Sequence, residues 1–322
     1  MSETHLLVLA DPTTPQLRLL DRLRDSTKIT IGDKRDEVSA AAVAAEVIFT
    51  WFSSAQLLRE IWPRTTQVSW VHSMSAGLEN LLFHGLVESS AVLTNGSGVF
   101  SQSLSEFVVA AVLYFAKDLG RMMRNQTRAV WEPFDVDVVS GRTLGIIGYG
   151  DIGKAVARRA KSLDMKILAL RRHPARSAGD PMVDEVFSPE RRFDLLARSD
   201  YVVLAAPLTE ETRSLLGPPE IAALKPSAVV INVGRGPVIF EPALVEALEH
   251  RRIRGAALDV FETEPLPAGH PFYRLENVLL SPHCADHTEG WMDQAVEFFV
   301  ENFERFRKGV PLMNVVDKKL GY

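Results

Sequence analysis

Short apolar runs recur along the first hundred residues, separated by polar stretches and turn signals. We predict strands at residues 5–10, 28–31, 47–50, 68–72 and 91–94. Between them lie segments of helical spacing, at residues 16–24 and in the alanine-rich stretch before residue 47. Brief apolar runs of this kind are typical of strands buried on both faces, and their alternation with helices is typical of a parallel sheet. The first part of the chain is therefore predicted to form an α/β unit of its own.

The same alternation returns in the second part of the chain. Strands are expected at residues 144–147, 166–170, 201–205, 228–233, 255–259 and 278–281, with helical pieces such as 242–250 between them. From residue 286 to residue 307 the pattern is helical again, and we expect this last helix to return to the first unit. The pattern thus predicts an α/β fold of two Rossmann-like domains with parallel sheets and a cleft between them. The predicted substrate domain is discontinuous, 1–98 plus 286–322, and the dinucleotide-binding domain spans 99–285.

One long helical segment, residues 104–124, is apolar on most of its circumference. A helix of that kind is normally buried on several sides. Its length and apolarity favour contact with a second copy of the chain, so a homodimer is expected. A core helix buried entirely within its own chain is the alternative that the sequence leaves open.

A glycine-rich turn follows the strand at 144–147. Its residues are Gly148, Tyr149, Gly150, Asp151, Ile152 and Gly153. In a dinucleotide-binding turn the first glycine permits the tight turn, the second lets the backbone approach a pyrophosphate, and the third lets the helix pack closely on the sheet. The helix start then offers free N–H groups to the phosphates. A position between strand and helix favours a dinucleotide site over a glycine-rich turn that binds nothing.

The second strand of this domain indicates which dinucleotide is bound. An NAD-specific site usually has Asp or Glu at the end of that strand, where it holds the ribose 2′-hydroxyl. Here the strand is followed by Arg171 and Arg172, and no carboxylate is present. A guanidinium suits a 2′-phosphate by charge and by its paired N–H groups. We therefore predict NADP(H) as the preferred cofactor, with NAD(H) possible. The alternative is that both arginines are solvated and NAD is accepted equally.

Composition narrows the function classes. The 322 residues carry a formal net charge of −5, so no basic surface argues for a nucleic-acid partner. Cys284 is the single cysteine, which fits a reducing cytoplasm. No apolar run is long enough to cross a bilayer and no signal peptide is recognised, so we expect a cytoplasmic protein without a membrane partner. No cluster of His, Cys and carboxylate residues has metal-ligand spacing, so no metal is implied.

Three later motifs make the prediction specific: Asn232-Val-Gly-Arg-Gly-Pro237, Leu258-Asp-Val-Phe-Glu-Thr-Glu-Pro265 and Ser281-Pro-His283. Together with the glycine-rich turn they resemble the D-isomer-specific 2-hydroxyacid dehydrogenases, in order and in rough spacing, over essentially the whole chain. Within that family the chain looks most like the glyoxylate/hydroxypyruvate reductase and 2-ketoacid reductase branch.

The resemblance implies a catalytic set of Arg235, Glu264 and His283. Hydride transfer at the substrate's C2 is coupled to a proton moving to or from the substrate oxygen, and a histidine titrates in the right range for that transfer. Glu264 would orient the imidazole and favour its protonated form. Arg235 would bind the substrate carboxylate, since its planar fork matches two oxygens.

The resemblance also implies binding residues. The substrate carboxylate would meet the backbone N–H groups of a loop in the first domain, with one side chain as a pocket wall: Met74, Ser75, Ala76 and Gly77. Further cofactor contacts would come from the second domain: Pro207, Thr212, Val233, Gly234, Asp259 and Ala285. Asp286 and His287 depart from the small residues that the family usually has after the histidine motif. We interpret Asp286 as a cap of the last helix.

The sequence therefore predicts an NADPH-preferring oxidoreductase that reduces small-molecule 2-ketoacids, such as glyoxylate or hydroxypyruvate, to D-2-hydroxyacids. The alternative is an NAD(P)H-sensing binding protein or corepressor on the same scaffold. Turnover of a 2-ketoacid would distinguish the two.

Overall fold

The computed structural model describes residues 3–322, which form two compact units. Unit 1 comprises Met1–Phe100 and Glu289–Tyr322, and unit 2 comprises Ser101–Thr288. Each unit is built around one sheet, and every strand pair within the two sheets is parallel. The predicted α/β class with two parallel sheets is confirmed.

Unit 1 has a five-stranded sheet in the order β2-β1-β3-β4-β5. Its strands are β1 (Thr4–Leu9), β2 (Thr27–Gly32), β3 (Val47–Thr50), β4 (Trp70–Ser73) and β5 (Val92–Asn95). Its helices are η1 (Pro15–Ser26), α1 (Arg35–Ala42), α2 (Ala55–Ile61), η2 (Trp62–Arg64), α3 (His84–Val87) and α10 (Trp291–Arg307). An order in which the first strand lies inside the sheet is that of a doubly wound fold, with helices on both faces.

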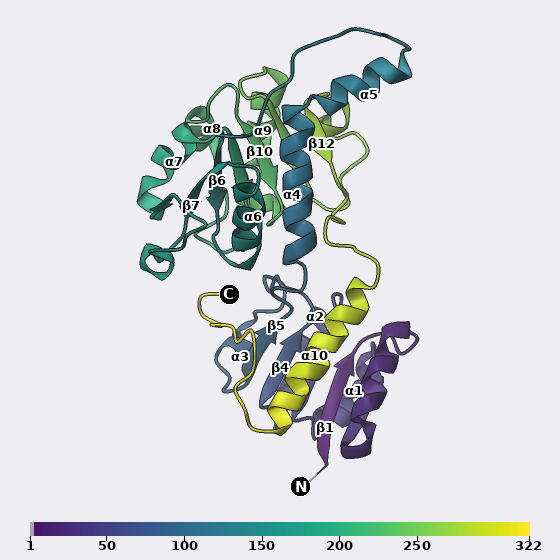
Figure 1. Ribbon diagram of the computed structural model, residues 1–322. Helices are drawn as coiled ribbons and strands as arrows, with labels where there is room; N and C mark the ends of the chain where they lie inside the picture. The colour runs from purple at the N-terminus through teal and green to yellow at the C-terminus, as the bar shows by residue number, and fades with distance from the viewer. Residues whose placement is uncertain (1–2) are drawn as a thin grey trace. The chain divides into compact units, whose positions relative to one another are not determined.

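The alternation of side chains along the strands divides the core of unit 1 into two layers. Leu7, Ile48 and Val71 point to the face covered by α1, α2 and α3. The neighbouring residues Phe49 and Trp70 point to the other face, where α10 lies (Figure 1). There the rings of Phe49 and Phe299 stack with centroids 4.1 Å apart. The last helix of the chain therefore completes the core of the first unit.

Unit 2 has a seven-stranded sheet in the order β12-β11-β10-β9-β6-β7-β8. Its strands are β6 (Thr143–Ile147), β7 (Lys166–Leu170), β8 (Glu185–Phe187), β9 (Tyr201–Leu204), β10 (Val229–Asn232), β11 (Gly255–Leu258) and β12 (Val278–Leu280). Its helices are α4 (Ser101–Ala116), α5 (Leu119–Thr127), α6 (Asp151–Lys161), η3 (Pro174–Ser177), η4 (Pro189–Arg191), α7 (Arg192–Arg198), α8 (Pro218–Ala222), η5 (Gly236–Val238), α9 (Glu241–Glu249) and η6 (Pro271–Arg274). The strand order reverses between β6 and β9, which is where this fold class binds its ligands.

The helices of unit 2 cover both faces of its sheet. Helices α7, α8 and α9 pack on Leu170, Leu204 and Val230 of the strands. Helices α4 and α6 pack against each other, and α4 also contacts β10 (Figure 1). Because both faces of the sheet are covered, its strands are apolar throughout. This explains why their apolar runs could be recognised as strands in the sequence.

Two helices differ from their predicted form. The predicted helix 104–124 is interrupted: α4 ends at Ala116, Asp118 takes a left-handed conformation (φ 48°), and α5 starts at Leu119. The segment expected to be helical at 16–24 is the 3₁₀ helix η1. Its buried residues Leu17, Leu20 and Leu23 are spaced by three, which matches the three residues per turn of that helix.

The interpretation of Asp286 as a helix cap is wrong. Helix α10 begins at Trp291, its N-cap residue is Gly290, and no side chain caps it. Asp286 instead lies in a turn of unit 2, where its carbonyl accepts a hydrogen bond from the N–H of Thr288.

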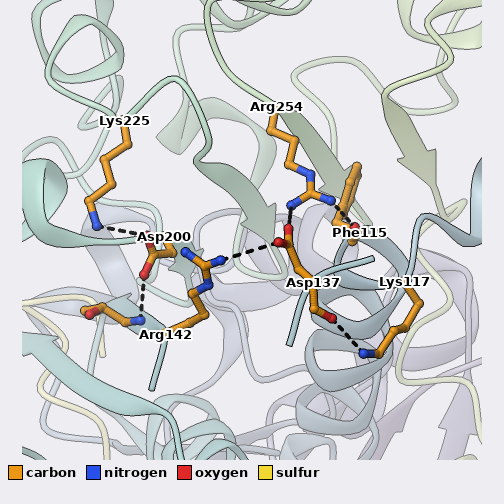
Figure 2. Close-up of polar contacts among 8 residues, drawn as sticks. Phe115, Lys117, Asp137, Arg142, Asp200, Lys225 and Arg254 are labelled. Atoms are coloured by element: carbon orange, nitrogen blue, oxygen red, sulfur yellow. Dashed lines mark hydrogen bonds and ion pairs between the residues drawn. The ribbon is translucent and has the colours of Figure 1, made fainter. Parts of the chain in front are cut away.

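A network of ion pairs joins the amino-terminal ends of the unit 2 strands (Figure 2). Arg254, just before β11, pairs with the Asp137 carboxylate and also donates to the carbonyl of Phe115 at 2.5 Å. Arg142, just before β6, reaches the same carboxylate at 3.4 Å. Lys225 and the backbone N–H of Thr143 hold Asp200, the residue before β9, at 2.9 and 2.8 Å. These contacts fix the irregular segment after α5 to the sheet edge opposite the strands' carboxyl ends.

Among residues 3–322, no helix is both long and apolar enough to cross a membrane.

Candidate active site

The glycine-rich turn leaves the carboxyl end of β6, the central strand of unit 2. Gly148 has φ +96°, and a Cβ there would lie 2.5 Å from the backbone nitrogen of Ala206. A Cβ on Gly153 would lie 2.4 Å from the carbonyl oxygen of Gly148. Both positions therefore exclude a side chain, one through its conformation and its contact with the β9 loop, the other through close packing of α6 on the turn.

Gly150 is different, because a Cβ there would meet nothing within 4 Å. It is the N-cap residue of α6 and, as a glycine, has no side chain to cap that helix. Open space at such a helix start suits an anion. The turn therefore fits the pyrophosphate of a dinucleotide, as the sequence predicted.

Tyr149 and Asp151 flank Gly150, but only Asp151 is exposed as Gly150 is. Tyr149 is buried, and its O–H donates to Asp180 Oδ2 at 3.1 Å. Burial, followed by that carboxylate, raises the pKa of Tyr149, so the phenol stays protonated. The bond ties the glycine turn to the loop after β7. Asp151 and the half-buried Ile152 begin α6.

The two arginines after β7 are both engaged. Arg171 Nη1 donates to Ser177 Oγ at 2.6 Å, within the same loop. Arg172 forms an ion pair with Glu211, which lies in the loop after β9. The structure thus gathers two guanidinium groups where the ribose of a dinucleotide is expected, together with a carboxylate that the sequence did not reveal.

His283 and Glu264 meet at the carboxyl ends of β11 and β12. His283 Nδ1 lies 2.6 Å from Glu264 Oε2. The other carboxylate oxygen, Oε1, accepts the N–H of Phe261 at 2.8 Å. His283 has φ +51°, a left-handed conformation that is uncommon for a side chain larger than glycine. The histidine is therefore held by a carboxylate that is itself fixed to the backbone.

The hydrogen bond that His283 donates to Glu264 raises the pKa of His283, although burial and the charge of Arg235 act in the opposite direction. For Glu264, burial acts to raise the pKa, but the bond to His283 and the N–H of Phe261 outweigh it, so that the pKa is lowered. The pair therefore favours a carboxylate beside an imidazolium near neutral pH. With Nδ1 bonded to Glu264, Nε2 is the nitrogen left to donate a proton elsewhere.

Asp259, at the end of β11, holds the histidine loop in place. Its Oδ1 accepts the O–H of Ser281 at 2.5 Å and the N–H groups of Cys284 and Ala285 at 3.0 Å each. The N–H of His283 donates to its backbone carbonyl at 2.9 Å. This accounts for a buried carboxylate at that position, and its contact with a cofactor stays a prediction.

Arg235 lies in the turn after β10, which Asn232 organises. Asn232 Oδ1 accepts the N–H of Gly234 at 3.1 Å, and its Nδ2 donates to the carbonyl of Arg235 at 3.1 Å. Arg235 Nη1 donates to the carbonyl of Gly234 at 2.8 Å. The guanidinium is near enough to Glu264 and His283 to influence the pKa of both. Unit 2 thus brings together all three residues of the predicted catalytic set.

The predicted substrate loop lies in unit 1, after β4. In the part of the chain that the structure describes, the N–H groups of Ser75, Ala76 and Gly77 donate to no protein acceptor. The loop is fixed by its carbonyls instead: Ser75 accepts from the N–H of Gly96 at 3.2 Å, and Ala76 from Asn95 Nδ2 at 2.7 Å. Three N–H groups on a fixed loop form a suitable nest for a carboxylate. Met74 is completely buried, so its side chain packs in the interior.

The remaining predicted cofactor contacts lie near the carboxyl ends of the unit 2 strands. Thr212 Oγ1 donates to the carbonyl of Pro207 at 2.6 Å and shapes the loop after β9. Val233 is buried, and a Cβ on Gly234 would lie 2.8 Å from the carbonyl oxygen of Ala206. The carbonyl of Ala285 accepts a 2.5 Å hydrogen bond from Ser103 on α4.

The sequence assigns no role to Asn232, Ser281 or Glu211, although Asn232 and Ser281 stand inside the motifs that carry the family resemblance. Their roles depend on hydrogen bonds and ion pairs that only the folded chain shows. Among residues 3–322, no group of three or more His, Cys, Asp or Glu side chains could hold a metal ion.

Comparison with known proteins places these features in one family. Residues 109–285 match the family model described as D-isomer specific 2-hydroxyacid dehydrogenase, NAD binding domain. A glyoxylate reductase of Korarchaeum cryptofilum is 33% identical over 274 residues, 81% of this chain and 80% of that protein. A glyoxylate reductase of Aeropyrum pernix is 34% identical over 261 residues, 78% of this chain and 76% of that protein. The crystal structure of a D-isomer specific 2-hydroxyacid dehydrogenase from Xanthobacter autotrophicus Py2, in complex with NADPH and MES, superposes over the full length of both chains with a TM-score of 0.86 at 28% identity.

Proposed function

This chain belongs to the D-isomer specific 2-hydroxyacid dehydrogenase family, and we propose that it reduces small 2-ketoacids, with glyoxylate and hydroxypyruvate as leading substrates, using NADPH in preference to NADH. Family membership makes it an NAD(P)-dependent oxidoreductase of 2-hydroxyacids. Similarity to two glyoxylate reductases supports the substrate class. The observation that carries the proposal is the 2.6 Å bond between His283 and Glu264, with Arg235 beside them.

When bound, the nicotinamide cofactor supplies the hydride for C2 of the substrate. His283, protonated and held at Nδ1 by Glu264, donates the proton from Nε2 to the substrate's carbonyl oxygen. Arg235 binds the substrate carboxylate through paired N–H groups and fixes the orientation of the ketone. In unit 1, the N–H groups of Ser75, Ala76 and Gly77 form a separate nest that suits a carboxylate.

The preference for NADPH is supported by Arg171 and Arg172, which follow β7. No Asp or Glu stands at the end of that strand, where an NAD site usually has one. A 28% identical relative has been crystallised with NADPH. Replacing both arginines by alanine should weaken NADPH binding by about 10- to 100-fold, since each charged hydrogen bond to a phosphate contributes about 1.5–3 kcal/mol before screening. NADH binding should change by less than about threefold.

The activity test measures oxidation of NADPH and NADH in parallel with glyoxylate, hydroxypyruvate, pyruvate and a branched 2-ketoacid. Faster turnover of glyoxylate or hydroxypyruvate with NADPH is the expected result. Faster turnover with NADH would refute the cofactor preference but leave the enzyme. Binding of both cofactors without turnover of any ketoacid would instead favour the NAD(P)H-sensing protein.

A glycine pair tests the cofactor site without relying on turnover. Gly150→Ala adds a methyl group into open space, so the fold should be unaffected, while phosphate approach to the α6 N–H groups is hindered. We expect the affinity for NADPH, measured by fluorescence titration, to fall at least tenfold. Gly269→Ala is the matched control, because a Cβ there also meets nothing within 4 Å. Equal binding by both variants would argue against a phosphate at this turn.

We also propose that the chain forms a homodimer through an apolar surface on α5 and the segment after it. Its exposed residues are Leu119, Met122, Met123, Val130, Trp131, Val136 and Val138. Trp131 is 97% exposed, and such a concentration of apolar side chains is typical of an interface. Light scattering after size exclusion should show a dimer for the wild type and a monomer for Trp131→Glu. A wild-type monomer would refute the proposal.

A further inference from the structure

The ion pair between Arg172 and Glu211 spans the glycine-rich turn. Arg172 follows β7 and Glu211 lies in the loop after β9, while β6 runs between those two strands. All three strands are parallel, so their carboxyl ends lie at one edge of the sheet. The pair therefore links the loops on either side of the turn that begins at Gly148, over the part of unit 2 where a dinucleotide's phosphates and adenine ribose are expected.

The loop that carries Glu211 has a defined shape. Thr212 Oγ1 accepts the N–H of Thr209 at 2.8 Å and donates to the carbonyl of Pro207 at 2.6 Å. The N–H of Arg213 donates to the carbonyl of Thr209 at 3.0 Å. Glu211 is thus presented from an ordered turn, although 67% of its side chain is exposed.

The position of this carboxylate is chemically informative. A site for NAD usually has Asp or Glu at the end of the second strand, where it accepts the ribose 2′-hydroxyl. Here that strand is followed by arginines, and a carboxylate reaches the same place from another loop. The site therefore combines the cation that suits a 2′-phosphate with the anion that suits a 2′-hydroxyl.

We propose that Glu211 is the residue that sets the balance between NADPH and NADH, an inference that rests on the proposed dinucleotide site. With NADPH, the 2′-phosphate and the Glu211 carboxylate compete for Arg172, and the two anions repel each other. With NADH, Arg172 keeps its partner and the carboxylate accepts the 2′-hydroxyl. Glu211 thus lowers the affinity for NADPH that Arg171 and Arg172 would otherwise give, and keeps NADH usable.

The size of the effect follows from charge and exposure. Repulsion between two unit charges about 4 Å apart in water changes a binding constant by about fivefold, and a 2′-phosphate carries nearly two charges. Salt and solvent reduce this for an exposed carboxylate. We therefore expect Glu211→Gln to tighten NADPH binding about 3- to 10-fold. The same variant should leave NADH affinity unchanged or lower it by up to about threefold, because a neutral amide is a weaker acceptor for the hydroxyl.

The test measures dissociation constants of NADPH and NADH by fluorescence titration of the full chain, in 20 mM and 300 mM salt. The variants are Glu211→Gln, Arg172→Ala and Glu210→Gln. Glu210 is the matched control, since it is an exposed neighbour on the same loop and its substitution makes the same change in net charge. An exposed ion pair contributes little to stability, so all variants should melt within a few degrees of the wild type.

Glu211→Gln alone should raise the ratio of NADPH to NADH affinity, and the gain should shrink at high salt. An equal gain in Glu210→Gln would show that the change in net charge alone causes the effect, and would overturn the inference. If Arg172→Ala weakens NADPH binding while Glu211→Gln leaves the ratio unchanged, the inference fails and the proposed site stands. If Arg172→Ala leaves NADPH binding unchanged, the arginine assignment itself fails, and the inference falls with it.

Discussion

Glu264 should control the pH range over which the enzyme reduces its substrate. Reduction requires a protonated His283, so its rate should fall as the pH rises through the pKa of that histidine. The hydrogen bond that the imidazole donates to Glu264 raises this pKa. Glu264→Gln removes the negative charge and leaves one oxygen to serve two donors, the imidazole and the N–H of Phe261. The pKa of His283 should therefore fall, and the alkaline limb of the profile should move to lower pH.

The magnitude can be worked from the contact. A hydrogen bond to a charged group contributes about 1.5–3 kcal/mol, against about 0.5–1.5 kcal/mol for a neutral one. The two ranges differ by about 1–1.5 kcal/mol, and because 43% of the His283 side chain is exposed to screening, we use no more than about 1.4 kcal/mol. That corresponds to about one pKa unit. Above both pKa values, kcat/KM for reduction should be about tenfold lower than in the wild type, whereas below them it should agree within about twofold.

The assay is kcat/KM for NADPH oxidation with glyoxylate between pH 5.5 and 9.5. Glu262→Gln is the matched control, because Glu262 is exposed, lies two residues away and makes no side-chain contact with His283 among the described residues. Its profile should follow the wild type. A uniform loss of activity in Glu264→Gln, with the midpoint unmoved, would refute the role of Glu264 in setting the histidine's pKa.

Two further predictions concern stability. Arg254→Ala should lower the free energy of unfolding by about 1–3 kcal/mol, because the Asp137 carboxylate and the Phe115 carbonyl lose their shared donor. Calorimetry should then show a melting temperature several degrees lower with kcat unchanged, and an unaltered melting curve would contradict the importance of the network in Figure 2. Burial lowers the pKa of His72 to about 3, whereas in the unfolded chain it is near 6.5. Below pH 6.5 the unfolded state binds a proton that the folded state does not bind. The free energy of unfolding should therefore fall by about 2 kcal/mol from pH 7 to pH 5. Urea denaturation should show this dependence of unfolding free energy on pH in the wild type, and its loss in His72→Gln. An equal dependence in both proteins would show that groups other than His72 cause it.

The strands were the most predictable part of the fold. Residues 47–50 and 166–170 coincide with β3 and β7, because strands buried on both faces are apolar throughout and end at turn residues. The edge strand β8 was missed, since its three residues leave no recognisable run. The break at Asp118 was missed because the apolar spacing continues across it, while the cause is a local left-handed conformation.

In the candidate site, the family resemblance carried by the motifs selected Arg235, Glu264 and His283, which the structure brings together in unit 2. It could not select Glu211, because a single carboxylate in a polar loop has no distinguishing pattern. Its contact with Arg172 links positions 39 residues apart along the chain, on loops that follow different strands. Only the strand order, with β6 between β7 and β9, explains why they meet.

The way α10 completes unit 1 has a consequence for synthesis on the ribosome. The aromatic face of the first sheet, with Phe49 and Trp70, is covered by Phe299 and Phe303. Those residues are translated only after all of unit 2, residues 101–288. At about 5–20 residues per second, the nascent first unit would wait roughly 10–40 s for its covering helix. During that interval its apolar sheet face is a natural target for chaperones, while unit 2 can fold without delay.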